Sequence, residues 1–249
     1  MLADPLFYLV SIPGVLLYGI AKGGFGGSIS VLAVPLMALV MAPTQAAAIL
    51  LPILLVMDAL VVRTYWGQFD RRALVLLLPG AMMGILCGYL VAEHMNDDYM
   101  RVLIGTLALI FGIQSLLGWV SHGSRNHNRF SASFFGALAG FTSFSIHAGA
   151  PPFQMYLVPK RLAPLVYAGT SGMFFAVVNV VKVVPYFALG QFTSQNLLYA
   201  LVLVPLAPLG VKVGHILVMR TRPSTYYGII SVFLIVVGLK LLWEGLGLG

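Results

Sequence analysis

Long runs without a charged residue are the feature that most limits how this chain can fold. No Asp, Glu, Lys or Arg occurs in residues 73–92, 102–120, 162–181 or 183–211. A helix needs about 20 apolar residues to cross the hydrocarbon core of a bilayer. The runs therefore predict an all-α polytopic membrane protein. The expected spanning helices lie near residues 44–62, 73–92, 102–120, 163–188, 195–218 and 224–243.

The composition excludes most other classes of protein. Charged residues make up 8% of the 249 residues, whereas a soluble domain carries roughly 25%. That is too few for the surface of a soluble enzyme or a nucleic-acid-binding module, and the 60% hydrophobic content rules out a disordered chain. The single cysteine, Cys87, excludes an internal disulfide and a cysteine metal site. We expect no metal and no cofactor. The N-terminus carries Asp4 and no basic residue before Lys22, so it does not resemble a signal peptide.

The charges separate by loop and predict the orientation. Nine basic residues and one acid, Asp70, lie in residues 63–72 and 121–130 and in the pairs 160–161 and 220/222. The alternate segments hold five acids and only Arg101 as a base. Basic residues accumulate in cytoplasmic loops. We therefore expect both termini to lie outside the cell (inner) membrane.

Two further apolar regions, 6–41 and 131–159, are interrupted by glycine or proline at 22–27 and 145–152. The orientation of the loops requires each region to begin and end on the same side, so each predicts a helical hairpin. Arms of about 13–17 residues would be roughly 20–25 Å long, which is short for a core of about 30 Å. We expect re-entrant or partly spanning pairs; ten short spans are the alternative.

The two halves of the chain resemble each other. Ala42-Pro43 matches Ala163-Pro164, and Gly67-Gln68-Phe69 matches Gly190-Gln191-Phe192. The motif Leu78-Pro79…Gly84-x-x-x-Gly88 matches Val204-Pro205…Gly210-x-x-x-Gly214, and Gly112 matches Gly238, so that the four offsets are 121, 123, 126 and 126.

Arginines flank only the first Gly-Gln-Phe, so the repeat is inverted. We expect repeats at 1–122 and 131–249 joined by a cytoplasmic linker at 123–130, each a hairpin plus three spanning helices, with 8–10 helical segments in all. Inverted repeats with broken helices are typical of transporters. A duplication without a transport role is the alternative.

The chain resembles the TauE/SafE sulfite exporter family over nearly its whole length. The resemblance rests on Lys22-Gly-Gly-Phe-Gly-Gly27 followed by Val34-Pro35-Leu36, on Gly136-x-x-x-Gly140…Gly149, and on Ala168-Gly-Thr-Ser171. It implies a four-span duplication that exports sulfite, sulfonates or other sulfur-containing organic anions. The second half departs from the family pattern, because His147-Ala-Gly149-Ala-Pro151-Pro152 stands where a glycine cluster is usual.

The two breaks are the expected substrate site. Ser28 is a candidate N-cap for a helix over 29–41, and Pro151 and Pro152 favour a helix start. Free N–H groups and the positive ends of two such helices would bind an anion. The predicted binding residues in the tips are Lys22, Gly23, Gly24, Gly26, Gly27, Ser28, His147 and Gly149.

Each of these residues has an alternative role. The glycines serve instead for close helix packing. Lys22 pairs with the anion or extends toward the membrane surface. His147 donates to an oxyanion or titrates during transport; a neutral histidine bonded to a carbonyl is the other reading.

Four residues outside the tips complete the predicted site. Asp58 is the only acid inside a predicted span, so it is a proton relay or a partner of Arg63. Lys182 has a coupling or gating role, or extends to the outer surface. Thr170 and Ser171 donate hydroxyl groups to an oxyanion, as the resemblance suggests, or bond within the helix bundle.

Together these features predict a secondary transporter that moves a small sulfur-containing anion by alternating access, with the hairpins moving relative to six spans. A cation- or proton-coupled carrier or channel centred on Asp58 is the alternative. Motifs for an intramembrane enzyme or for nucleotide binding are absent from the sequence. The expected partners are the anion and the lipid bilayer, with no nucleic acid; proton coupling and a homo-oligomer stay open.

Overall fold

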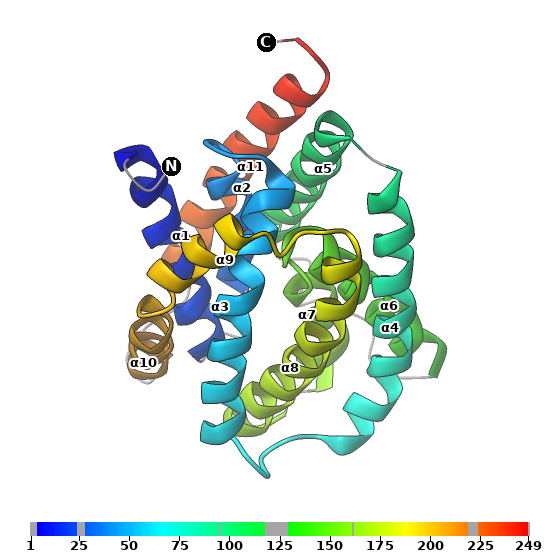
Figure 1. Ribbon diagram of the computed structural model, residues 1–249. Helices are drawn as coiled ribbons and strands as arrows, with labels where there is room; N and C mark the ends of the chain where they lie inside the picture. The colour runs from blue at the N-terminus through cyan, green and yellow to red at the C-terminus, as the bar shows by residue number, and fades with distance from the viewer. Residues whose placement is uncertain are drawn as a thin grey trace.

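The computed structural model describes residues 4–23, 28–94, 96–117, 129–160, 162–218 and 224–248. These residues form helices and connecting segments, without a β-strand among them (Figure 1). In chain order the helices are α1 (Pro5–Gly23), η1 (Ser28–Leu32), α2 (Ala33–Met37), α3 (Pro43–Thr64), α4 (Arg71–Glu93), α5 (Asp97–Leu116), α6 (Arg129–Ile146), α7 (Ala150–Leu157), η3 (Val158–Lys160), α8 (Pro164–Ala188), α9 (Ser194–Leu203), α10 (Leu206–Val218) and α11 (Ser224–Gly245).

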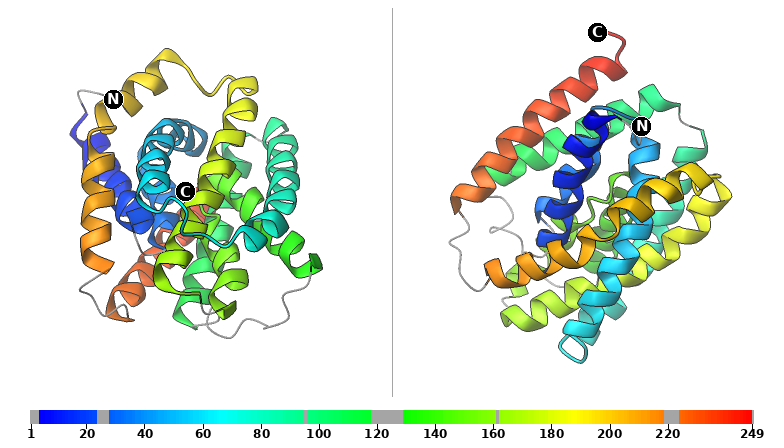
Figure 2. Two further views of the ribbon diagram at one scale, coloured as in Figure 1. Left: turned by 90° about the horizontal axis from the view of Figure 1, so that it is seen from below. Right: turned by 60° about the vertical axis from the view of Figure 1, so that its left-hand side comes forward.

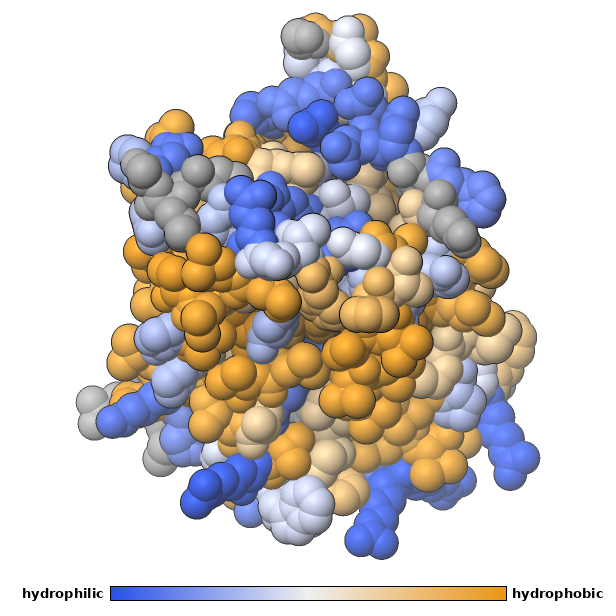
Figure 3. Space-filling view, viewed as in Figure 1, coloured by the Kyte–Doolittle hydropathy of each residue, from blue (hydrophilic) through white to orange (hydrophobic). Residues whose placement is uncertain are grey.

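The helices have the lengths and surface of a membrane protein. In the described part of the chain, α1, α3, α4 and α8 are each long and apolar enough to cross a bilayer, and the bent pair α9 and α10 is a fifth candidate. Apolar side chains form a broad band around the middle of the visible face, with hydrophilic side chains at its two ends (Figure 3). The chain is therefore an all-α polytopic membrane protein, as the sequence predicted.

The two hairpins have unequal arms. The first arms, α1 and α6, contain 19 and 18 residues, or roughly 28 Å at 1.5 Å per residue. The returning arms are short: η1 and α2 have five residues each, and α7 has eight. The expectation of two arms of 13–17 residues was wrong, as was a continuous helix over 29–41. Leu32, not Ser28, is the N-cap of α2, and its side chain makes no capping bond.

The predicted span 195–218 is broken into α9 and α10, which meet at an angle of 44°. Pro205 lies between them, and a proline cannot supply the N–H of a continuing helix. The matching Pro79 lies inside the unbroken α4. Packing around each proline, rather than the proline alone, therefore decides whether the helix divides.

The starts and the following loops of α3 and α8 have the same construction. Both helices follow an alanine N-cap and begin with proline, as the sequence match indicated. Gly67 and Gly190, in the loops after these helices, have φ angles of 79° and 65°, which suit glycine. Three residues later Asp70 and Thr193 cap α4 and α9, and each side chain accepts a 3.1 Å hydrogen bond from the N–H three residues on. The matched sequences thus form matched turns.

The long arm of each hairpin packs on a helix from the other half of the sequence. Helix α1 lies along α10, and α6 lies along α4 (Figure 2). Glycines bring the backbones together: a Cβ atom on Gly210 would meet the Cα of Gly19 at 3.0 Å, and one on Gly84 would overlap the carbonyl oxygen of Ala137. The Gly-x-x-x-Gly segments are therefore packing faces.

Helices α5 and α11 form a third close pair. A Cβ atom on Gly105 would lie 2.8 Å from the carbonyl oxygen of Gly238, and one on Gly238 would lie 2.9 Å from that of Gly105. The two helices therefore pack backbone to backbone at these two glycines.

Candidate functional site

The second hairpin turns at His147, the one residue other than glycine that has a positive φ (54°) in the described part of the chain. Its N–H donates to the carbonyl of Ser143, and the next N–H, that of Ala148, donates to Thr142, both at 3.1 Å. Such bonds and a left-handed residue are a common way to end a helix. The break therefore lies where the sequence predicted it, with prolines in the first turn of α7.

The imidazole of His147 is 1% exposed and has a partner on each ring nitrogen. Nε2 lies 2.9 Å from the carbonyl oxygen of Ala47, so Nε2 must carry a hydrogen. Nδ1 lies 2.7 Å from the Nζ of Lys182. One of these two nitrogens must accept, so an imidazolium and an ammonium cannot both be present in this contact. The Lys182–His147 pair therefore carries at most one positive charge.

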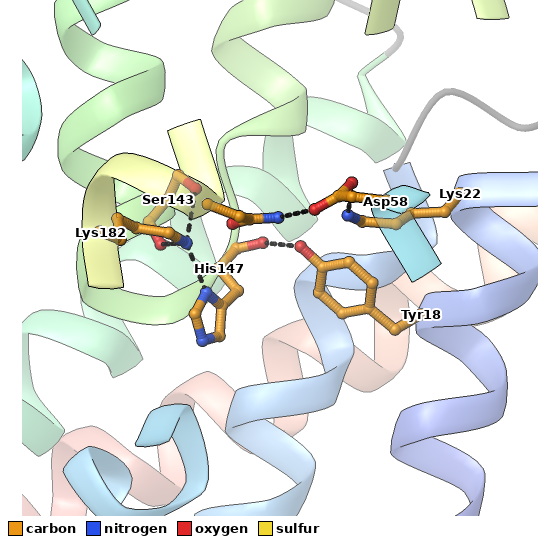
Figure 4. Close-up of polar contacts among 7 residues, drawn as sticks. Tyr18, Lys22, Asp58, Ser143, His147 and Lys182 are labelled. Carbon is orange, nitrogen blue, oxygen red and sulfur yellow. Dashed lines mark hydrogen bonds and ion pairs between the residues drawn. The ribbon is translucent and has the colours of Figure 1, made fainter. Parts of the chain in front are cut away.

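Lys182 is fully buried in α8. Its ammonium donates to the carbonyl oxygen and to the hydroxyl of Ser143, at 2.9 and 3.1 Å (Figure 4). The expectation that Lys182 extends to the outer surface was therefore wrong. Its nearest partners are neutral, and a buried cation without a carboxylate costs free energy unless other groups compensate it.

The two hairpins meet through Tyr18 of α1. Its hydroxyl donates to the carbonyl oxygen of His147 at 2.8 Å (Figure 4). Tyr186 of α8 also lies against the imidazole, with ring centroids 6.0 Å apart. The break in the second hairpin is thus fixed by hydrogen bonds to α1, α3 and α8.

Lys22 lies in the last turn of α1 and forms an ion pair with Asp58 of α3. The second oxygen of Asp58 accepts a 2.6 Å hydrogen bond from the amide of Asn179 in α8. Asp58 is 3% exposed. The suggested pair of Asp58 with Arg63 was therefore wrong, as was the extension of Lys22 to the surface. The sequence could not show this contact, since it depends on how α1 crosses α3.

A small cavity opens beside the Lys22–Asp58 pair. It has a volume of about 20 Å³, enough for about one water molecule. The polar residues that line it are Tyr18, Lys22, Ser30, Asp58 and Ser171. Val61, Ala150, Gly172 and Phe175 provide the remaining, apolar wall. The cavity therefore combines a charged pair with two hydroxyl-bearing serines.

Of the two predicted hydroxyl donors, only Ser171 lines this cavity. The hydroxyl of Thr170 donates to the carbonyl of Val166 at 2.6 Å and accepts from the N–H of Asp70 at 2.9 Å. Thr170 therefore joins α8 to the loop before α4, which is the bonding within the bundle that the sequence left as an alternative.

The predicted glycines are used for packing where the structure describes them. A Cβ atom on Gly149 would lie 2.6 Å from the carbonyl oxygen of Ala139, and Gly23 is in similar contact with α10. Ser28 begins η1. Gly24, Gly26 and Gly27 lie outside the described residues. The returning segment after this tip begins with η1 and α2, of five residues each, and not with a long helix.

Tyr18, Ser30 and Asn179 are the polar site residues that the sequence reasoning missed. Asn179 could have been found, because it follows Asp58 by 121 residues, the offset that relates Ala42-Pro43 to Ala163-Pro164. Within the described ranges, no cluster of three His, Cys, Asp or Glu is arranged for a metal ion.

The family model described as "Sulfite exporter TauE/SafE" matches residues 11–241. No curated protein and no solved structure matches the chain. The matched range contains both hairpin breaks, both lysines of the site and the whole cavity lining.

Proposed function

The chain belongs to the TauE/SafE sulfite exporter family, a family of membrane transporters, and from this premise we propose that it exports a small sulfur-containing anion across the cytoplasmic membrane. The substrate class is sulfite, a sulfonate or a similar organosulfur anion. It binds between the two hairpins, beside Lys22 and Ser171. The protein acts as a secondary transporter and not as an enzyme.

The observation that carries the proposal is that two lysines lie beside a single buried carboxylate. Lys22 pairs with Asp58, whereas the side-chain nitrogen of Lys182 has only the uncharged groups of Ser143 and the imidazole of His147 as partners. Hydrogen-bond donors are therefore in excess of carboxylates here, so an anion fits this site better than a cation.

The size of the cavity requires the hairpins to move during binding. About 20 Å³ is room for roughly one water molecule, which is too little for a sulfur atom with three oxygens. Because Tyr18 and Lys22 come from α1 and Ala150 from α7, separating the hairpins would widen the cavity. We propose that this separation, alternating between the two sides, gives access to the site.

The two halves supply the symmetry that such a cycle needs. We infer that residues 1–122 and 131–249 are inverted repeats, with 123–130 as a cytoplasmic linker and both termini outside. The matched turns after α3 and α8, and the matched packing of α1 on α10 and of α6 on α4, support this inference. Exchange of the two halves' conformations would then open the site to the opposite side.

Binding of anions to purified protein in detergent tests the proposal. Sulfite, thiosulfate, sulfate and methanesulfonate should be compared by titration calorimetry, with choline as a cation control. At least one sulfur anion should bind. Lys182→Met should weaken binding by roughly 10- to 150-fold, which corresponds to about 1.5–3 kcal/mol for an interaction with a charged group.

Lys240→Met is the matched control, because Lys240 is 51% exposed near the end of α11 and pairs with Glu244. This change should leave affinity unaltered. Absence of binding by every sulfur anion, or equal affinity in Lys182→Met and the parent, would contradict the proposal. Preferential binding of choline would favour the alternative of a cation carrier centred on Asp58.

A further inference from the structure

We propose that Asp58 takes up a proton when the anion binds, and that Asn179 stabilises both the charged and the protonated form of Asp58. This inference rests on the proposed function. It makes one proton the co-substrate of one anion at the same site.

The carboxylate of Asp58 lies beside the ammonium that an entering anion would bind. Asp58 and Lys22 both line the cavity, and their side chains are in direct contact. An anion that binds the ammonium of Lys22 must therefore lie next to the carboxylate of Asp58. Two negative charges at one buried site repel each other, and the usual result is that one of them binds a proton.

The other lysine near Asp58 already has hydrogen-bond partners. Lys182 could in principle replace Lys22 as the partner of Asp58, but its ammonium is bonded to Ser143 and His147. Moving the Lys182 side chain would break its two hydrogen bonds to Ser143 and its contact with His147. Uptake of a proton neutralises Asp58 without moving Lys182.

The amide of Asn179 is placed to bond with either form of Asp58. Its amide nitrogen donates to Asp58 at 2.6 Å, and the residue is 1% exposed. Its amide oxygen is buried, and no described residue donates to it. Rotation of the amide would therefore break only the bond to Asp58. After rotation the oxygen faces Asp58 and can accept its O–H.

The proposed step is balanced without any other reactant. A proton passes from water to the carboxylate oxygen that faces Asn179, and the new O–H donates to the rotated amide. The Lys22 ammonium leaves the carboxylate and donates to the anion. No covalent bond other than the O–H changes, and the charge of the site is conserved because one proton enters with one anion.

Ionisable side chains surround Asp58 and Asn179 on the helices that pack against them. They are Tyr18 and Lys22 on α1, Lys182 on α8, His147 at the break between α6 and α7, and Arg63 and Tyr65 farther along α3, with His215 of α10 against Tyr65. Asp58 is the only acid among them, so it is the group that an entering anion destabilises most.

Proton uptake on binding of methanesulfonate tests the inference. Methanesulfonate is the anion of a strong acid, so it does not bind a proton near neutral pH, whereas sulfite does. The purified protein is placed in weakly buffered detergent solution with a pH indicator, and binding is followed by calorimetry in the same solution. We expect about one proton taken up per anion bound.

Two variants identify the group that takes up the proton. Asp58→Asn should bind the anion with no uptake, because asparagine resembles the protonated acid. The double variant Asp58→Asn/Asn179→Asp exchanges the pair between α3 and α8 and should restore uptake, which a merely structural role of Asn179 would not do.

The outcomes separate the two proposals. If the parent binds none of the sulfur anions, the proposed function fails and this inference with it. If the parent binds methanesulfonate without proton uptake, or if Asp58→Asn takes up protons like the parent, the function stands and the coupling through Asp58 is wrong. If the double variant binds without uptake, the role of Asn179 is wrong.

Discussion

Tyr65 and Tyr186 make the same hydrogen bond at matching positions in the two halves. The hydroxyl of Tyr65 donates to the carbonyl of Gly23 at 3.1 Å, and that of Tyr186 donates to the carbonyl of Phe144 at 2.7 Å. The two donors are 121 residues apart, and so are the two acceptors. Because α3 and α8 end on opposite sides of the molecule (Figure 1), the two bonds hold the long hairpin arms from opposite sides.

We expect these bonds to keep the site closed, one toward each side of the membrane. Tyr65→Phe should increase cytoplasmic access to the cavity, and Tyr186→Phe should increase external access. Loss of about 1 kcal/mol from one neutral hydrogen bond corresponds to roughly a fivefold change in the open population. The measurement is the rate of labelling of Ser171→Cys by a membrane-impermeant thiol reagent, in a Cys87→Ser background.

Tyr99→Phe is the control for this pair, because Tyr99 is 62% exposed on α5 and should have no effect. If either variant changed the labelling rate equally from both sides of the membrane, the two tyrosines would not each close one side of the site.

Removing one member of the Lys22–Asp58 pair should destabilise the fold far more than removing both charges. Lys22→Met leaves a buried carboxylate without its cation, at a cost of about 3–5 kcal/mol. The double variant Lys22→Met/Asp58→Asn should recover most of that loss. The free energy of unfolding of each variant is measured by adding denaturant to the protein in detergent. A double variant as unstable as Lys22→Met would rule out charge as the cause.

Gly84→Ala should force α4 and α6 apart, since its Cβ would overlap the backbone carbonyl of Ala137. Backbone cannot yield as a side chain does, so we expect a loss of about 1–3 kcal/mol in the free energy of unfolding. Gly14→Ala is the matched control in α1, where the nearest atom would be at an ordinary 3.5 Å. That variant should be neutral or slightly stabilising, as alanine favours helix over glycine. Equal stabilities of the two variants would contradict the packing argument.

The orientation predicted from the charges can be tested with single cysteines in the Cys87→Ser background. Arg71→Cys, at the start of α4, should react with an impermeant reagent only from the cytoplasm. His94→Cys, exposed just beyond the other end of the same helix, should react only from outside. Labelling of Arg71→Cys from outside would invert the assignment of both termini.

The sequence predicted the spanning helices better than the hairpins, for a physical reason. Hydropathy measures whether a segment can lie in lipid, and it is nearly the same on both sides of each break. It therefore located α3, α4 and α8 but could not show that the returning arms are short. Pro79 and Pro205 make the same point, because only the second divides its helix.

The candidate site was predicted residue by residue, but its contacts were not. Lys22, Asp58, His147 and Lys182 were each identified as buried or functional from their positions in apolar segments. Their pairing depends on which helices cross, and α8 is far from α1 and α3 in the chain. Asn179 has no charge and belongs to no motif, so only the repeat offset of 121 residues points to it.

The packing of α1 against α10 sets the order in which the protein can be assembled. A membrane chain is inserted from its N-terminus as it is synthesised, so α1 enters the bilayer before α10 is made. Until then the glycine face of α1 lacks the helix that it packs against in the folded protein. Helix α6, in contrast, finds α4 already in place. A chain interrupted before Leu206 therefore leaves the packing face of α1 without its partner helix.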